Sequence, residues 1–437
     1  MFQPARGTRD FLPDEMLKRN WVLDNIRRVF EDYGYEPLGT PAFESWDMLK
    51  IKSGEDAVNQ IYYFKDKSDR ELGLRFEWTA SLVRVVSTHR ELPKPFKRYA
   101  IGPVWRYERP SEKRFREFWQ ADVDIVGVED TIADTEVLAV AVDCLMRIGF
   151  EGFMIRLNDR RLLEALVAVA GIDAREPMDV FRAIDKIDKI GEEGVLEELG
   201  KLGTSEEDSR TLLGLVSRKG EPQEIIQSVK KELSDFLSEG EPEILLNGVA
   251  ACDDLLSIVN YTKDFGIESN VIADLGLARG LDYYTGVVFE IYALGYEDYG
   301  SIAGGGRYDK VVELFGGEPT PMTGVSLGIE RIVLLLDKKG SFEGLNLGTD
   351  VFVVSVSDNV RSEVVKVVQS LRRAGIPSEF DHLSRGMRRQ LEIADRKGVR
   401  KVVIVGKREL AGGYVTVRDM ATAEQRKVPI DRLVDEI

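Results

Sequence analysis

The stretch LGLARGLDYYTGVVFE (275–290), followed by SIAGGGRYD (301–309), carries the strongest structural signal in this chain. Arg279 and the adjacent pair Tyr283 and Tyr284 stand between strand-like sequences. A guanidinium is a planar, permanently charged donor for a carboxylate or phosphate, and tyrosines offer faces and hydroxyls to a planar polar ring. The glycine triplet of the second run lets a ligand approach the backbone closely. The pattern predicts a ligand site on a sheet, and a sheet edge with a Gly-rich hairpin is the alternative.

Length and composition are those of an ordinary globular protein. The chain has 437 residues, which is enough for two or three domains that each have their own core. No apolar run approaches the roughly 18 residues of a membrane span, and the N-terminus has no signal-peptide pattern. We therefore expect a cytoplasmic protein.

Cysteine and histidine are scarce. Cys144 and Cys252 form neither a disulfide framework nor a zinc site, and both stand in apolar helical patterns. His89 and His382 lie far apart in the chain, so histidine acid–base chemistry and histidine-ligated metals are not expected. The chemistry must therefore come from arginine, carboxylates and positioning.

The charge of the chain is unevenly distributed. Its net charge is −16, which argues against a nucleic-acid partner, but residues 94–116 and 385–401 are both rich in lysine and arginine. Two basic segments in an otherwise acidic chain predict a partner that binds at two separate sites. Solvated helix faces are the alternative for each segment.

The periodicity predicts an α+β protein with several parts. Residues 1–337 read as a mainly β domain, interrupted at 160–262 by an acidic helical insertion. A Gly-rich linker follows at 338–349, and residues 350–437 alternate strands and helices as a small α/β domain does. Pro37 and Pro41 interrupt an early strand, which indicates a sheet edge or an inter-subunit position.

The segment VWRYERPSEKRFREFWQ (104–120) reads as strand, charged loop and strand. Arg106 would project from a strand and could bind an α-phosphate. Glu108 can accept a hydrogen bond from an exocyclic amine such as that of adenine, and Phe118 offers a stacking face for a base. Arg114 and its neighbour Arg116 stand where the loop would close over phosphates or an RNA end. A surface hairpin with ion pairs is the alternative.

Two further strand patterns place polar side chains on one face. Glu77 and Thr79 in LRFEWTAS are two residues apart, so both would face an α-ammonium group. Gln120 and Asp124 in FWQADVD also share a face. In GVSLGIERI, Arg331 enters an apolar helix, where a buried ion pair is the alternative to a ligand contact.

These segments resemble, in order, the three motifs of class II aminoacyl-tRNA synthetases. The first is the helix and strand that end near Pro41, the second is 104–120, and the third is GVSLGIERI. LARGLDYYTG and AGGGRYD closely resemble the two histidine-binding motifs of histidyl-tRNA synthetases. SRGMRRQLEIADRKGVRKVVIVG (384–406) resembles the anticodon-binding domain that several class II enzymes share. Phe76 and Trp78 depart from the family pattern around Glu77.

The resemblance implies a class II catalytic domain and a histidine–tRNA ligase. Such an enzyme forms histidyl-adenylate from L-histidine and Mg-ATP and transfers histidine to the 3′ end of tRNA(His), releasing AMP and pyrophosphate. A homodimer without a fixed protein cage for Mg²⁺ is expected. The residues implied are Arg106, Arg279 and Arg331 for catalysis; Glu77, Thr79, Arg106, Gln120, Asp124, Arg279, Tyr283 and Tyr284 for histidine; and Arg106, Glu108, Arg114, Phe118 and Arg331 for ATP.

Two alternatives remain. One is an inactive synthetase-like regulatory subunit of ATP phosphoribosyltransferase, a binding module that typically lacks the C-terminal domain and the catalytic arginines. The other is a class II enzyme for a different amino acid, against which the paired histidine motifs argue.

Overall fold

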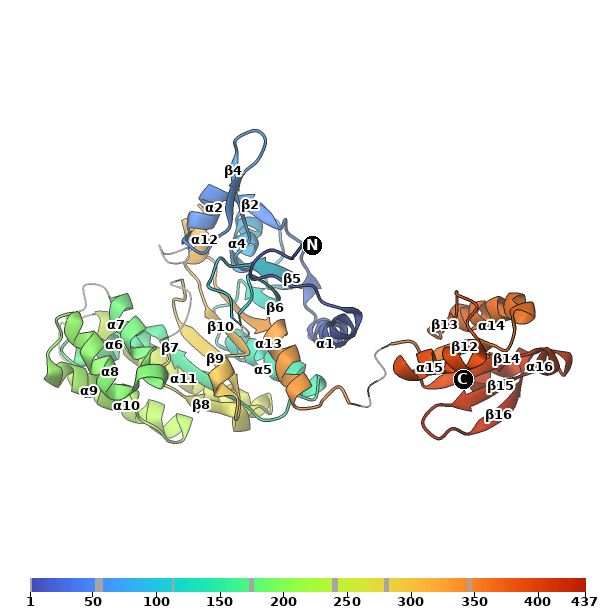
Figure 1. Ribbon diagram of the computed structural model, residues 1–437. Helices are drawn as coiled ribbons and strands as arrows, with labels where there is room; N and C mark the ends of the chain where they lie inside the picture. The colour runs from blue at the N-terminus through green and yellow to red at the C-terminus, as the bar shows by residue number, and fades with distance from the viewer. Residues whose placement is uncertain are drawn as a thin grey trace. The chain divides into compact units, whose positions relative to one another are not determined.

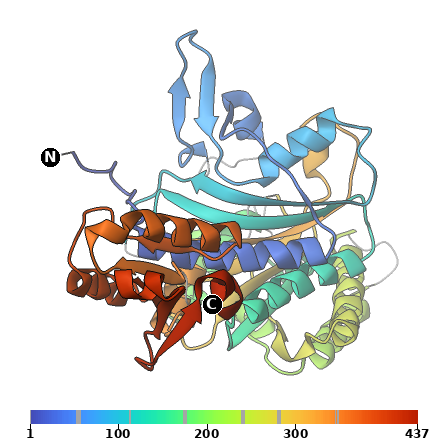
Figure 2. The same cartoon turned by 90° about the vertical axis from the view of Figure 1, so that its right-hand side faces the viewer.

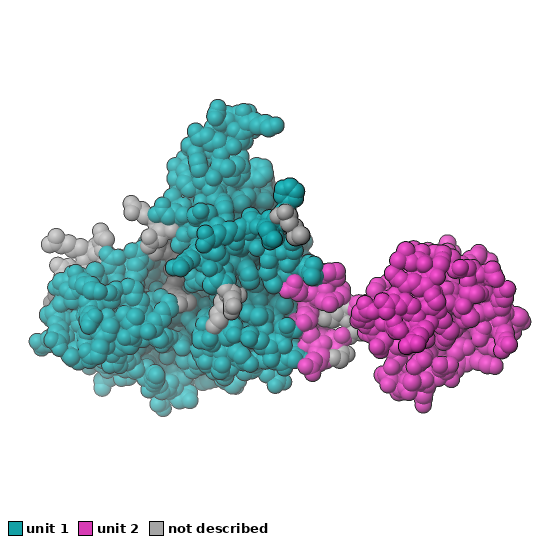
Figure 3. All heavy atoms as spheres, in the orientation of Figure 1, with its two compact units in different colours: residues 1–12, 22–341 teal, residues 13–21, 342–437 magenta. Residues whose placement is uncertain are grey.

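The computed structural model describes residues 2–51, 58–111, 114–172, 177–237, 243–278, 283–343, 345 and 348–437. The chain divides into two compact units, which Figure 3 shows in different colours. Unit 1 comprises Met1–Leu12 and Val22–Ser341, and unit 2 comprises Pro13–Trp21 and Phe342–Ile437.

Unit 1 is built on an eight-stranded sheet with the order β1-β5-β6-β11-β10-β9-β7-β8 (Figure 1). The pairs β1–β5 and β7–β8 at its two edges are parallel, and the pairs between them are antiparallel. Pro37 lies in the edge strand, as the sequence predicts. The strands are β1 (Glu36–Pro37), β5 (Phe96–Trp105), β6 (Glu117–Val126), β7 (Phe153–Asp159), β8 (Val271–Ala273), β9 (Val287–Ala293), β10 (Ala303–Arg307) and β11 (Met322–Gly328).

The strict alternation of β6 separates a core face from a polar face. Ala121, Val123 and Ile125 are buried on the face where α5 (Ile132–Arg147) packs against β6, β10 and β11. The intervening residues of β6 face the other way and are polar. Outside the helical insertion, unit 1 also contains α2 (Trp46–Ile51), α4 (Thr79–Thr88), α12 (Val311–Leu314) and α13 (Ile329–Lys338), while α1 (Pro13–Asp32) is divided between the two units after Trp21.

A second, three-stranded sheet in unit 1 has the order β2-β4-β3. It consists of β2 (Phe43–Ser45), β3 (Tyr63–Lys65) and β4 (Glu71–Leu74). The β3–β4 hairpin projects from the rest of unit 1 in both Figure 1 and Figure 2.

Helices fill the stretch between β7 and β8, where the sequence predicts a helical insertion. They are α6 (Arg160–Val169), α7 (Pro177–Ile184), α8 (Ile187–Lys201), α9 (Glu206–Val216), α10 (Pro222–Phe236) and α11 (Glu243–Asp264). Gly248 of α11 crosses α6 so closely that a Cβ there would lie 2.4 Å from the Cβ of Ala165. This contact explains why a glycine stands in the middle of a long helix.

Within the described part of the chain, α11 is the one helix that is long and apolar enough to cross a membrane, with a mean hydropathy of 1.2. The sequence had led us to expect no such run. Two carboxylates interrupt the helix, and both form ion pairs: Asp253 with Lys230 and Asp254 with Arg161. The helix packs against α6, α10 and α5, as a helix of a globular domain does.

Unit 2 has its own five-stranded sheet with the order β13-β12-β14-β15-β16. The first three strands are parallel and the last two antiparallel. Val-rich strands are buried on both faces, against α14 on one and α15 on the other, as in other α/β sheets. The elements are β12 (Val351–Ser355), α14 (Arg361–Arg373), β13 (Ser378–Phe380), α15 (Met387–Arg396), β14 (Lys401–Val405), α16 (Lys407–Ala411), β15 (Tyr414–Asp419), β16 (Gln425–Pro429) and α17 (Leu433–Glu436). The expected α+β class is confirmed.

Candidate active site

A cavity of about 440 Å³ lies in unit 1, and its floor is a row of residues across four strands. Asp122 of β6 pairs with Ser326 of β11, Ser326 with Gly304 of β10, and Gly304 with Glu290 of β9. All four residues line the cavity. Because paired residues in an antiparallel sheet project to the same face, this row places two carboxylates and a hydroxyl beside an open glycine.

Asp122 is a site residue that our sequence analysis missed. Its side chain is 5% exposed, and burial raises the pKa of this carboxyl to about 7, against the lowering effects of Arg98 and of a hydrogen bond with Ser326. Asp124 and Glu77 add to the rise by charge repulsion. The alternation that made us pick Gln120 and Asp124 includes the residue between them, so the signal was present.

Asp124, which we expected at the ligand, does not line the cavity. It stands opposite Arg98 in the β5–β6 ladder, and their side chains approach to 2.5 Å. The Tyr308 hydroxyl donates to Asp124, and Gly324 lies so close that a Cβ there would meet the carboxylate at 2.2 Å. Asp124 is thus engaged by Arg98 and Tyr308, while Asp122, opposite the small Ala100, lines the cavity.

Glu77 and Thr79 line the cavity together, but at the N-terminus of α4 and not on a strand, as the sequence had wrongly predicted. The Glu77 carboxylate accepts hydrogen bonds from the backbone N–H groups of Thr79 (2.5 Å) and Ala80 (2.9 Å). These groups have no acceptor inside the helix, so the carboxylate both caps the helix and is held in place by it. Such a fixed carboxylate suits an ammonium ligand.

Arg106 follows β5 and reaches the cavity between two aromatic rings. Its guanidinium carbon lies 4.4 Å from the centre of the Phe76 ring and 5.1 Å from that of Phe118. Burial lowers the pKa of this guanidinium, partly against the attraction of Glu108. Phe76, a departure from the family pattern, thus packs directly on the expected catalytic arginine.

The loop between β5 and β6 brings further expected residues to the cavity wall. Glu108 and Arg114 both line the cavity and form an ion pair with each other at 2.6 Å. Arg116 has a different position from the one we expected. Its N–H donates to the carbonyl of Gly7 at 2.8 Å, and its guanidinium donates to the carbonyls of Glu108 and Arg6. Arg116 therefore joins the N-terminal segment to this loop.

Arg331 enters the cavity from the first turn of α13 and donates to the carbonyl of Ser301. Ser301 in turn donates its hydroxyl to Glu290 at 3.0 Å, so the arginine and this carboxylate share one bridging residue. The neighbouring Glu330 accepts from the backbone N–H of Trp119 at 2.6 Å, which fixes the start of α13 against β6. Glu290 and Ser301 are also site residues that the sequence analysis missed.

Tyr283 and Tyr284 line the cavity, and their ring centres are 4.8 Å apart. Tyr308 packs edge-on against Tyr283 at 5.5 Å. Burial raises the pKa of both cavity tyrosines, so their hydroxyls stay protonated donors. A Cβ on Gly306 would lie 2.3 Å from the carbonyl of Val287 and 3.1 Å from the Tyr284 ring, so a glycine is required behind this wall.

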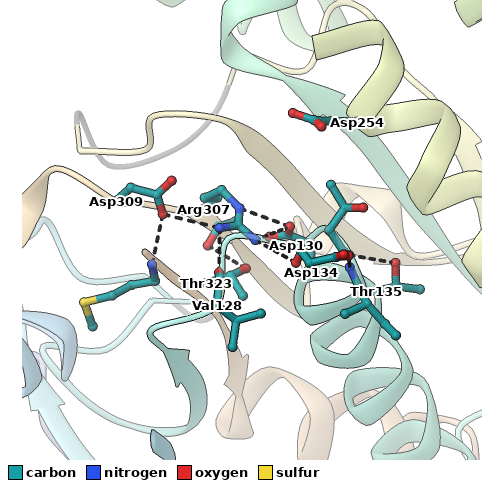
Figure 4. Close-up of polar contacts among 12 residues, drawn as sticks. Val128, Asp130, Asp134, Thr135, Asp254, Arg307, Asp309 and Thr323 are labelled. Carbon is teal, nitrogen blue, oxygen red and sulfur yellow. Dashed lines mark hydrogen bonds and ion pairs between the residues drawn. The ribbon is translucent and has the colours of Figure 1, made fainter. Parts of the chain in front are cut away.

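The charged residues of AGGGRYD serve the sheet rather than the cavity. Arg307 stands on the face of α5 and forms an ion pair with Asp134 at 2.6 Å, as Figure 4 shows. Its guanidinium also donates to the carbonyls of Val128 and Asp130. Asp309 accepts from the N–H of Met322 at 2.9 Å. A buried charge that is paired and hydrogen-bonded in this way holds β10 on α5.

Arg279 lies outside the described residues, so its placement stays a prediction. Of the other expected residues, Glu77, Thr79, Arg106, Glu108, Arg114, Phe118, Gln120, Tyr283, Tyr284 and Arg331 line one cavity. Among the described residues, no group of three or more His, Cys, Asp and Glu side chains could hold a metal ion.

The antiparallel sheet, the arginine-bearing β5–β6 hairpin and the arginine of α13 together form the catalytic fold of a class II aminoacyl-tRNA synthetase. Residues 7–332 match the family model for histidyl-tRNA synthetase, and residues 350–437 match that for an anticodon-binding domain. The chain therefore belongs to the histidyl-tRNA synthetase family.

Individual relatives agree with this assignment. A histidine–tRNA ligase of Pyrococcus abyssi is 40% identical over 438 residues, covering 100% of this chain and 99% of the relative. The crystal structure of histidyl-tRNA synthetase from Nostoc sp. PCC 7120 superposes with a TM-score of 0.87 at 31% identity, covering 100% of this chain and 98% of that one. A Bacillus halodurans structure, titled as an ATP phosphoribosyltransferase regulatory subunit/histidyl-tRNA synthetase, shares the fold at 23% identity with a TM-score of 0.74, over 93% of this chain and 98% of that one.

Proposed function

We propose that this chain activates L-histidine with Mg-ATP to histidyl-adenylate and transfers the histidyl group to the 3′ end of tRNA(His), releasing AMP and pyrophosphate. The observation that carries the proposal is the single cavity that combines Arg106, Arg331 and the Glu77–Thr79 pair with the Asp122–Glu290 row. Family membership over the whole chain supports it.

The residues at one end of the cavity would serve the ammonium group and the imidazole of histidine. Glu77 and Thr79 would hold the α-ammonium group, and Gln120 would assist them. Asp122 and Tyr284 would bind the imidazole nitrogens, and Asp122 would take the histidine-binding role that we had first assigned to Asp124. An amino acid without the imidazole would leave these buried polar groups unpaired, which disfavours its binding strongly.

The ATP end would work through charge. The histidine carboxylate attacks the α-phosphorus, and Arg106 with Arg279 would stabilise the charge that develops there. Arg331 would orient the pyrophosphate. Phe118 would stack on adenine, and Glu108 would accept from its amine in exchange for the ion pair with Arg114.

Mg²⁺ bound with ATP would neutralise phosphate charge. It prefers oxygen ligands and commonly takes one or two carboxylates with water and phosphate. Glu290 supplies such an oxygen on the cavity wall, bridged by Ser301 to Arg331. We therefore propose Glu290 as the residue that would help to hold the ion.

The transfer step needs the tRNA at two points. The ribose hydroxyl at the 3′ end attacks the activated carbonyl, and positioning supplies much of the rate. Unit 2, which includes the matched anticodon-binding region, would bind the anticodon, with its basic residues 385–401 meeting phosphates.

We also propose a homodimer. Phe43, Tyr63 and Phe64 of the small sheet are 52%, 44% and 37% exposed, which is unusual for three neighbouring aromatic residues. Together with the Pro-containing edge strand β1, they suit burial against a second copy. Light scattering at micromolar concentration should give twice the chain mass, and a monomer mass would contradict the proposal.

The regulatory-subunit alternative has less support. The structure titled in that way is only 23% identical, which indicates a common fold and no more. Arg106 and Arg331 line the cavity, and the C-terminal domain is present. The cytoplasmic location stays a prediction.

One assay tests the proposed function directly. ATP–pyrophosphate exchange is measured with each of the twenty amino acids in turn. We expect exchange with histidine alone. Exchange with a different amino acid would refute the histidine assignment, and none with any amino acid would favour a binding module.

A further inference from the structure

Asn158 and Arg160, at the junction of β7 and the helical insertion, contact both ends of the histidine motif. The segment NDRR (158–161) was not singled out in the sequence. It ends a strand of the central sheet and starts α6, the first helix of the insertion.

Asn158 holds the N-terminal end of the motif. Its side chain is fully buried, and the two N–H groups of its amide donate to the carbonyls of Leu275 and Leu277, each at 3.1 Å. Only a side chain with two donors on one nitrogen can satisfy two backbone acceptors in this geometry. The buried carbonyls would otherwise lack these donors.

Arg160 holds the C-terminal end. Its guanidinium donates to the carbonyl of Tyr284 at 3.1 Å, and its backbone N–H donates to the carbonyl of Gly286 at 3.0 Å. Tyr284 is one of the two tyrosines of the cavity wall. The main chain that carries this ring is therefore hydrogen-bonded to the first residue of the insertion.

The insertion in turn fixes Arg160. Its guanidinium donates to Glu164 of α6 at 3.0 Å and contacts the sulfur of Met178 in α7 at 3.5 Å. The next residues anchor the turn itself: Asp159 caps α6, and Arg161 joins Asp159 to Asp254 of α11. The whole junction is thus tied to the insertion helices.

We propose that Asn158 and Arg160 are positioning residues for the amino-acid half of the site, and that through Arg160 the helical insertion sets the affinity for histidine. This inference rests on the proposed function. Neither residue lines the cavity, so both act through the main chain of the motif and the Tyr284 ring.

The test compares Arg160→Met and Asn158→Asp with matched controls. Arg160→Met removes the guanidinium at similar length. Asn158→Asp keeps the shape of the side chain and removes both donors. Arg218→Met breaks an ion pair with Glu232 elsewhere in the insertion, and Asn270→Asp removes a hydrogen bond to Phe153 outside the motif.

We expect both variants to raise the KM for histidine in pyrophosphate exchange by roughly tenfold or more, as the loss of buried hydrogen bonds predicts. The KM for ATP should stay within about twofold of its original value, because the phosphate-binding arginines keep their supports. Calorimetric titration with histidine alone should show the same loss of affinity. Arg160→Lys, which keeps one donor, should recover part of it.

Several outcomes would overturn the proposal. An equal rise in both KM values would indicate general damage, and unchanged histidine affinity in the folded variants would show that the contacts do not position the site. If Asn158→Asp does not fold, the proposal is tested by the histidine KM of Arg160→Met and by its partial recovery in Arg160→Lys. Lack of histidine-dependent exchange in the unmodified protein would instead refute the proposed function.

Discussion

Replacing Asp122 by Asn should make the protein more stable and less active. The carboxyl is buried in the cavity floor, and burial raises its pKa to about 7. An acid whose pKa is raised on folding opposes folding when it ionises, because the unfolded chain gives up its proton more readily. The penalty is absent below the pKa of the unfolded chain, grows as the pH rises, and is complete above about 7. An amide has no such charge to bury.

The pKa values determine the size of the effect. A rise from 3.8 to about 7 corresponds to a penalty of about 4 kcal/mol at pH 8 and about 1.5 kcal/mol at pH 5. The stability gain of Asp122→Asn should therefore grow by about 2.5 kcal/mol between these two pH values. The same substitution should raise the KM for histidine about tenfold or more, since a charged hydrogen bond to the imidazole is lost.

Urea unfolding at pH 5 and pH 8, followed by the fluorescence of tryptophans in unit 1, measures the difference. Asp47→Asn, the same change on an exposed helix residue, controls for the substitution and the baselines. A variant that is less stable than the unmodified protein at pH 8 would show that Arg98 stabilises the carboxylate by more than burial costs. A gain that does not depend on pH would refute the argument equally.

Three further perturbations separate the parts of the machinery. Arg279→Ala should abolish most histidine-dependent pyrophosphate exchange without changing the circular dichroism spectrum; near-normal exchange would refute its catalytic role. Gly7→Ala should raise the KM for ATP several-fold, because φ is +86° and the new Cβ would lie 2.7 Å from Cδ of Arg116. Gly34→Ala is its control, because Gly34 also has a positive φ (+75°) but no atom within 4 Å of the added Cβ. If both variants changed the KM for ATP equally, the effect of Gly7→Ala would come from backbone strain and not from the contact with Arg116. Deleting residues 345–437 should reduce tRNA charging far more than pyrophosphate exchange, and equal losses would count against a separate role for that domain.

Much of the architecture follows from local pattern. Two-residue alternation predicts β6, strand-like sequence predicts β9 and β11, and the helical period predicts α6 to α11. Arg106 is recognisable because it stands at the end of a strand pattern beside a charged loop, whereas the role of Arg331 came from the resemblance of GVSLGIERI to the third class II motif. Strand and helix patterns depend on residues that are close in the chain, so they can be read from the sequence alone.

The choice between Asp122 and Asp124 was made by tertiary structure. Alternation puts both carboxylates on one face of β6, and the order of residues along that strand does not distinguish them. The register does, because it sets Asp124 between Arg98 and Gly324 under the Tyr308 hydroxyl, and Asp122 between Ala100 and Ser326 at the cavity.

Contacts between segments that are distant in the chain determined the positions of Arg116, Glu290 and Ser301. Arg116 reads as a phosphate ligand in the sequence, yet it binds the backbone at Gly7, more than a hundred residues away. Glu290 and Ser301 belong to the site because β9, β10 and β11 align across the sheet. The sequence by itself determined which elements form and which side chains carry charge, because those depend on local periodicity and residue chemistry. Which charges meet a ligand and which meet each other was determined only by the pairing of strands that are remote in the chain.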